Sequence, residues 1–241
     1  MIIVRSWMES QSHRIPRDTS RFKGSLVRLI ESEGEGLAPN AQVAEQAPGW
    51  VLATHFHREY QFQLFTQGYG TIGGHAIQPL MIHYTSPESG YGPIVAGPEG
   101  LSYYTLRPTV PAGACYLPES RNQLQRGLRK RHAMSSSIDF ASEPTHSGEP
   151  CRIRECIQVD GDGMGAWQVS LGPGGVCEGS RLPGIGARYC FVAAGSMVVG
   201  SRVLEQGSIS FVHGEPGFEL RAGDAGLRVL VMQFPMAATP L

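Results

Sequence analysis

An all-β fold of two tandem β-sandwich domains, with one short helix between them, is predicted by three features of this 241-residue sequence. Glycine (31 residues) and proline (17 residues) are abundant, while 41% of the residues are hydrophobic, which is enough for a packed core. Short β-branched and aromatic runs recur about every ten residues, as in YQFQLFTQG and RYCFVAAGSMVVG. Both halves also lead from an aromatic strand through a glycine to an apolar strand closed by proline, as in TLRP and MQFP.

The domain boundary is predicted at a stretch rich in serine and proline, AMSSSIDFASEPTHSGEP, which spans residues 133–150. This linker separates an N-terminal domain over residues 1–132 from a C-terminal domain over residues 151–241. A helix is predicted from Pro118 to about Met134, because Leu124 and Leu128 lie four residues apart among basic residues. We expect these basic side chains to form a solvated face.

Composition narrows the classes of partner. The net charge of −1 does not favour nucleic acid or an anionic membrane. The sequence has no apolar run of about 18 residues, and its N-terminus becomes polar too soon for a secretory signal. The five cysteines include no C-x-x-C pair, which favours reduced thiols. We therefore expect a cytoplasmic protein whose partners are a small organic molecule and a second copy of the chain in a homodimer.

One stretch concentrates the residues that can carry chemistry: it runs from Gly49 to Gly68 and reads GWVLATHFHREYQFQLFTQG. Alternate residues of a strand share a face, so His55 and His57 point the same way and can hold one metal ion through imidazole nitrogens. On the next strand, Gln61 shares its face with other polar residues, Glu59 and Gln63. The sequence therefore predicts a polar pocket around the two histidines.

This stretch resembles the first motif of the cupin superfamily, G-x5-H-x-H-x3,4-E-x6-G, at every spacing, with Gln61 in place of the glutamate. The resemblance implies a jelly-roll β-sandwich, whose interior in many members holds Fe, Mn, Ni, Zn or Cu. It also implies activities such as dioxygenase, isomerase, decarboxylase or lyase, and it includes members with no chemistry. The fold alone therefore selects no reaction.

The altered ligand position changes the expected metal chemistry. The carbonyl oxygen of Gln61 can still bind a metal ion, but more weakly than a carboxylate does. A general acid or base must then come from elsewhere, and Glu59 and Tyr103 are the residues we expect in catalysis. We expect a divalent ion (Fe, Zn, Mn or Ni) on His55, His57, Gln61, His83 and Tyr91.

The second cupin motif, G-x5-P-x-G-x2-H-x3-N, is not matched after Gly68. Its last ligand position falls on Tyr91 or on Tyr103, depending on the alignment, and His83 is available from an adjacent strand. We expect His132 to be a surface group. Arg107, in TLRP, is expected to cap the sheet edge, with contact to a carboxylate substrate as the alternative.

The second copy of the fold lacks the histidine pair. When Gly195 is aligned with Gly68, Arg188 takes the position of the metal-binding carboxylate, and a guanidinium cannot bind a cation. We therefore expect no metal in the C-terminal domain, which would instead cover the first domain or form a dimer surface.

Three hypotheses for function follow from these features. The first is a metal-dependent enzyme acting on a small organic acid or ketone. The second is a sensor or binding cupin without catalysis, and the third is a protein that acts through its surface.

Overall fold

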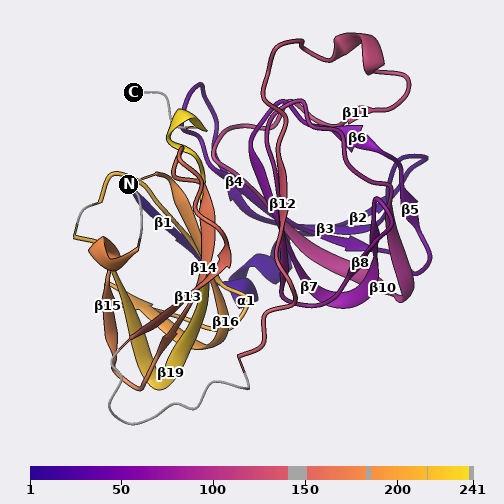
Figure 1. The fold of residues 1–241 in the computed structure, drawn as a ribbon. Coiled ribbons are helices and arrows are strands. Elements are labelled where there is room, and N and C mark those ends of the chain that lie inside the picture. Colours follow the sequence, from indigo (N-terminus) through magenta and orange to yellow (C-terminus); the bar gives the residue numbers. More distant parts are fainter. Residues whose placement is uncertain (141–150, 183–185, 216, 239–241) are drawn as a thin grey trace. The chain divides into compact units, whose positions relative to one another are not determined.

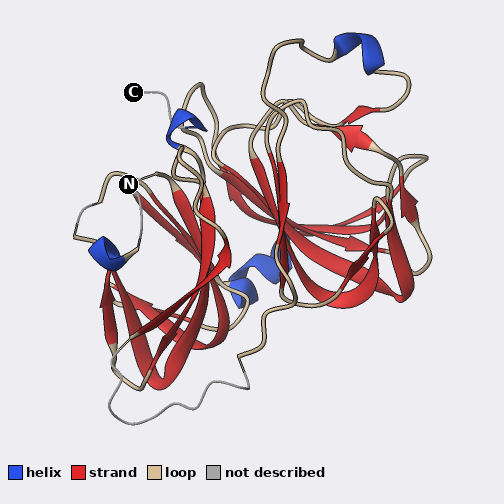
Figure 2. Cartoon of the chain, in the orientation of Figure 1, coloured by secondary structure: helices blue, strands red, loops and turns tan. Residues whose placement is uncertain are grey.

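The computed structural model describes residues 1–140, 151–182, 186–215 and 217–238. The chain divides into two compact units (Figure 1). The N-terminal unit comprises Ser12–Ile138, and the C-terminal unit comprises Met1–Gln11 together with Asp139–Leu241. Strands dominate both units, and the helical segments are short (Figure 2). No helix in the described parts of the chain is long and apolar enough to cross a membrane.

The N-terminal unit is built on one antiparallel sheet. Among the described residues its strand order is β12-β9-β7-β10-β4-β3-β2, with β5 on β10 and β8 on β7, while β6 pairs with β11. The elements are β2 (Arg14–Asp18), β3 (Lys23–Glu31), β4 (Asn40–Gln46), β5 (Val51–Leu52), β6 (His55–Phe56), β7 (Gln61–Ile72), β8 (His75–Ile77), β9 (Met81–Thr85), β10 (Ile94–Arg107), β11 (Cys115–Tyr116), η2 (Arg121–Gln123) and β12 (His132–Met134).

The C-terminal unit repeats this plan. In the part of it that the structure describes, the strand order is β1-β18-β16-β19-β14-β13, with β15 on β19 and β17 on β16. The elements are β1 (Ile2–Arg5), α1 (Trp7–Ser10), η1 (Gln11–His13, which ends in the N-terminal unit), β13 (Arg152–Ile157), β14 (Gly165–Leu171), β15 (Val176–Glu178), η3 (Gly179–Arg181), β16 (Arg188–Val199), β17 (Arg202–Leu204), β18 (Ile209–Val212), β19 (Glu219–Gln233) and η4 (Met236–Ala238).

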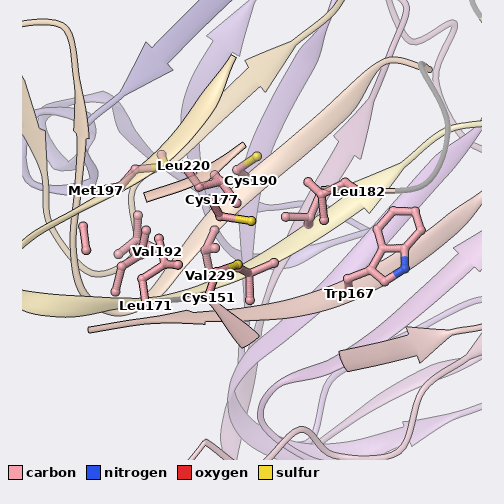
Figure 3. Packing of buried hydrophobic residues seen from close by; sticks show 14 of the residues in the cluster. Cys151, Trp167, Leu171, Cys177, Leu182, Cys190, Val192, Met197, Leu220 and Val229 are labelled. Carbon is pink, nitrogen blue, oxygen red and sulfur yellow. The ribbon is translucent and has the colours of Figure 1, made fainter. Parts of the chain in front are cut away.

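The interior of the C-terminal unit is mainly apolar. Figure 3 shows side chains from several strands packed together, with the sulfur atoms of Cys151, Cys177 and Cys190 among them. Trp167 and Val229, on neighbouring strands, belong to the same buried cluster. The apolar residues that the sequence pattern assigned to strands thus form the core that holds this unit together.

Two glycines confirm the predicted repeat in detail. Gly68 of β7 is paired with Leu101 of β10, and Gly195 of β16 is paired with Leu227 of β19. Both glycines have positive φ angles, +77° and +71°, and each leaves no room for a Cβ atom beside a carbonyl oxygen of the neighbouring strand. Only glycine combines this conformation with such a close approach, so the strand pairs β7–β10 and β16–β19 are equivalent.

The N-terminal segment does not belong to the predicted domain 1–132. Its strand β1 pairs antiparallel with β18, and α1 is held by hydrogen bonds from Ser6 and Met8 to the Glu205 carboxylate, of 2.6 and 2.8 Å. The segment therefore covers an edge strand of the C-terminal sheet, which would otherwise expose unpaired backbone groups.

The prediction of a helix from Pro118 to about Met134 was wrong. Residues 118–134 contain one 3-10 turn, η2, and no α-helix; the single α-helix in the described part of the chain is α1. Leu124 is half-buried and Leu128 is exposed, and Gly127 has a φ of +82°, so the two leucines do not form a buried apolar face. At the end of this stretch, β12 pairs with β9.

The predicted linker begins later than residue 133. Residues 133–138 belong to the N-terminal unit. Residues 141–150 of the predicted linker lie outside the described part of the chain.

Candidate functional site

The interior of the N-terminal unit carries polar side chains on β7 and β9. Gln63 is paired with His83 across the two strands, and its Oε1 accepts a hydrogen bond of 2.8 Å from His83 Nδ1. Gln61, two residues earlier, lies on the same face, and both glutamines are at most 1% exposed. The alternation seen in the sequence therefore does direct a polar row into the interior.

His55, Tyr91 and Gln61 meet at one point. The backbones of His55 and Tyr91 exchange two hydrogen bonds of 3.1 and 2.9 Å, which fixes the two residues opposite each other. The Tyr91 hydroxyl is 2.9 Å from His55 Nε2 and accepts a hydrogen bond of 2.9 Å from Gln61 Nε2. His55 Nδ1 is 2.7 Å from the carbonyl oxygen of Ala53, so this nitrogen carries the proton and Nε2 accepts from Tyr91. We call these three residues the Tyr91 cluster.

His57 lies beside this cluster but has other partners. Its Nδ1 donates to the Gly113 carbonyl oxygen at 3.0 Å, and its Nε2 is 3.5 Å from Nη2 of buried Arg107. Glu59 lies on the Nδ1 side of His57, at 3.9 Å, and its Oε1 accepts a hydrogen bond from the Ala112 amide. The arrangement runs from carboxylate through imidazole to guanidinium.

A pocket of about 440 Å³ is lined in part by Tyr91. His83 and His132 line it with their rings stacked, and His132 Nδ1 is 3.4 Å from His83 Nε2. His75 and the apolar side chains of Ile72 and Met134 complete the wall. A pocket of this volume accommodates a small organic molecule.

Burial keeps the imidazoles of the site neutral. It lowers the pKa of His55 and, with help from the nearby Arg107 charge, holds the pKa of His57 well below its ordinary value. Burial also lowers the pKa of His83 to about 3 and raises that of Tyr91 to about 12. At neutral pH the site therefore presents neutral imidazoles and a neutral phenol near the buried cation of Arg107.

We expect the stability of the metal-free N-terminal unit to fall as the pH decreases below about 6.5. The pKa of His83 is about 3 in the folded chain, so between these values the unfolded chain binds the extra proton. His83 alone is expected to contribute about 1.4 kcal/mol per pH unit, and His55 and His57, whose pKa values burial also lowers, act in the same direction. Urea unfolding between pH 7 and 4.5 measures the total slope. His83→Asn should reduce this slope by about the contribution of one group, the same change at exposed His13 should not, and equal slopes in all three proteins would contradict the assignment.

The structure brings together part of the predicted metal set. His55, Gln61 and Tyr91 converge, whereas Nε2 of His57 contacts Arg107 and that of His83 contacts His132. Tyr103, the alternative to Tyr91, lies in the apolar cluster next to Phe65, and its hydroxyl is 3.5 Å from Gln46 Oε1.

Sequence reasoning misplaced one residue of the site and missed a contact of another. Arg107 does not cap the sheet edge but lies buried against His57. His132, expected as a surface group, is exposed but also stacks on His83 at the pocket wall. The alternation of side chains along β10 places Arg107 on the inner face of the sheet, and this pattern could have predicted its burial.

The Tyr91 cluster fits a metal ion better than the full predicted set does. Gln61 Oε1 is buried and has no hydrogen-bond partner in the described part of the chain, although buried polar atoms are almost always paired. His55 has the tautomer that metal-binding histidines adopt, with Nδ1–H on a carbonyl oxygen and the Nε2 lone pair directed inward. The nearby Arg107 charge opposes cation binding, so the cluster fits an ion held with modest affinity.

Comparison with solved structures shows the fold. A pirin from Escherichia coli in complex with nickel(II) matches with a TM-score of 0.58 and 14% identity over 98% of this chain and 99% of that one. A salicylate 1,2-dioxygenase variant from Pseudoaminobacter salicylatoxidans in complex with gentisate matches with a TM-score of 0.59 and 11% identity over 97% and 81%. A Nostoc punctiforme protein provisionally described as a dioxygenase matches with a TM-score of 0.62 and 14% identity over 100% and 81%.

These similar structures are cupins, and this chain has the fold of a bicupin, with two jelly-roll units in one polypeptide. No family model and no curated protein matches the sequence. At such low identity the likeness concerns the fold alone, so the function must be argued from the site.

Proposed function

We propose that the N-terminal unit is a metal-binding cupin that acts on a small organic molecule held in the pocket beside Tyr91. His55 Nε2, Gln61 Oε1 and the Tyr91 oxygen would hold one divalent ion, Fe, Zn, Mn or Ni. The observation that carries this proposal is the convergence of the three side chains at 2.9 Å contacts, together with the unpaired buried oxygen of Gln61. Nε2 of Gln61 is the atom that contacts Tyr91, so the amide would turn to present Oε1 to the ion. A bound ion would supply Lewis-acid polarisation of a carbonyl or enediol.

The surrounding residues have separate parts in this proposal. The neutral imidazoles of His83 and His132 offer hydrogen-bonding groups to the organic molecule, while Ile72 and Met134 contact its apolar portion. The Arg107 guanidinium favours a substrate that carries negative charge, such as an organic acid. Glu59 lies behind His57, so its predicted role as acid or base would run through that imidazole. Dioxygenase, isomerase and lyase chemistry all fit this arrangement, and a cytoplasmic homodimer stays a prediction.

Metal content measured by elemental analysis tests the proposal. Protein purified and dialysed against equimolar Zn²⁺ should retain about one equivalent. His55→Ala should retain less than about a fifth of that, because it removes the only imidazole in the cluster, while His83→Ala and exposed His13→Ala should retain the wild-type amount. Equal retention by wild type and His55→Ala would exclude this site.

A metal-free binding function is the second candidate, and the contacts of His57 favour it. Its Nε2 is engaged by Arg107, and the Tyr91 hydroxyl already bonds His55, so these four side chains have polar partners without an ion. Two results together would support this function. Denatured protein should release an organic ligand that mass spectrometry identifies, and wild type and His55→Ala should contain equally little metal. Protein that releases no ligand and loses its Zn²⁺ in His55→Ala would contradict it.

A further inference from the structure

The C-terminal unit contains a pocket of its own, with a volume of about 440 Å³. Leu182, Val212 and Phe218 form its apolar wall, and Arg188 and His213 contribute polar groups. Every one of these residues belongs to the C-terminal unit. The unit was expected to offer only packing surface, so this pocket has no role in the proposed metal chemistry.

Arg188 is placed in this pocket by strand register. It begins β16, pairs with Val212 of β18 and is 9% exposed. Cys190 and Val192, two and four residues later on the same strand, belong to the buried apolar cluster, so Arg188 points to the same side, above that core. Burial lowers the pKa of Arg188 from its ordinary value, which reflects the cost of removing a guanidinium from water.

The two units carry an arginine and a glutamine at exchanged positions. Relative to the equivalent glycines, Arg188 corresponds to Gln61, as the sequence alignment predicted. Gln233, which pairs with Arg188, corresponds to Arg107. Gln233 is fully buried, and its Oε1 has no hydrogen-bond partner among the described residues. The guanidinium of Arg188 therefore takes, in the C-terminal unit, the position that Gln61 has in the N-terminal unit. Gln233 lies opposite Arg188 on the neighbouring strand.

We propose that this pocket binds a small organic carboxylate, with the carboxylate on Arg188 and an apolar body against Leu182 and Phe218. A guanidinium matches a carboxylate in both charge and planar geometry, and its attraction for an anion increases where water is excluded. The pocket should prefer such a carboxylate to a small inorganic anion, because an inorganic anion would leave the apolar wall in contact with water. The acidic residue of the pocket, Glu215, is exposed and bonded to the amino group of Met1, so it lies at the rim.

Calorimetric titration of the full chain with three probes tests the proposal. Benzoate carries both the charge and the apolar body, benzamide carries only the body, and inorganic phosphate carries only the charge. Benzoate should bind at least about tenfold more tightly than either of the others. Arg188→Gln should weaken benzoate at least about tenfold, while Arg154→Gln, at an exposed position of the same unit, should leave it unchanged.

Circular dichroism establishes whether Arg188→Gln keeps its fold. Leu182→Trp is a second variant that tests whether benzoate binds in this pocket. It fills the pocket while leaving the guanidinium in place, so it should also weaken benzoate. The proposal is overturned if wild type does not bind benzoate, if benzamide binds equally well, or if folded Arg188→Gln binds as wild type does. Should Arg188→Gln not fold, an unchanged benzoate affinity in Leu182→Trp overturns it instead.

Discussion

Replacing Gly68 by alanine should destabilise the N-terminal unit by about 3 kcal/mol, the sum of two effects. The residue has a φ of +77°, where a Cβ atom is unfavourable, and that atom would overlap the carbonyl oxygen of Gly100. Neither the backbone of β7, which carries Gln61 and Gln63, nor that of β10 can move without disrupting the hydrogen bonds between the two strands. Urea unfolding followed by hydrogen exchange and mass spectrometry reports on each unit through its own peptides.

Matched glycines separate the two effects. Gly74→Ala has the conformational strain, with φ +85°, but no atom within 4 Å of the new Cβ, and should cost only about 1 kcal/mol. Gly195→Ala should reproduce the large loss in the C-terminal unit, whereas Gly161→Ala, which has neither problem, should change stability by less than about 0.5 kcal/mol. Equal losses for Gly68→Ala and Gly74→Ala would show that the close approach of the two strands does not matter.

Restoring the carboxylate of the cupin motif should raise metal affinity by about 100-fold, because the number of charged ligands strongly tunes affinity for a divalent ion. Gln61→Glu places an anionic oxygen next to Tyr91 and His55 without changing the length of the side chain. In the absence of metal the variant should be less stable than wild type, since its charge is fully buried. Competition between the protein and a chromogenic chelator for Zn²⁺ measures the affinity.

Gln63→Glu is the matched control for this gain. It makes the same change two residues further along the same face of β7, but its side chain contacts His83 rather than the Tyr91 cluster. It should raise Zn²⁺ affinity by less than about tenfold, through the electric field alone. A similar gain in both variants would indicate that position 61 does not bind the ion.

Strand alternation explains what could be predicted of the fold and the site. His55 and Gln61 were identified because the motif spacing and the period of two place them in the same interior, and the aligned glycines at positions 68 and 195 predicted the position of Arg188. These inferences depend on spacing within short stretches of sequence and on the repeat of such a stretch in the second half of the chain. They were therefore available from one sequence.

The remainder depends on contacts between distant segments. Tyr91 rather than Tyr103 meets His55 because a backbone bridge joins residues 36 apart, and the sequence alone does not specify that pairing. Strand β1 pairs with β18, which lies more than 200 residues away, so a short apolar N-terminus contained no local sign of its domain. The basic stretch after Pro118 was misread because leucine spacing predicts a helix only where an apolar face finds a partner.

X-ray absorption spectroscopy of the protein loaded with one equivalent of Zn²⁺ tests the central claim most directly. The account predicts a coordination shell that mixes oxygen donors with imidazole nitrogen, and the loss of the imidazole scattering in His55→Ala but not in His83→Ala. A shell of oxygen donors alone, or a spectrum that is identical in wild type and His55→Ala, would contradict metal binding at the Tyr91 cluster.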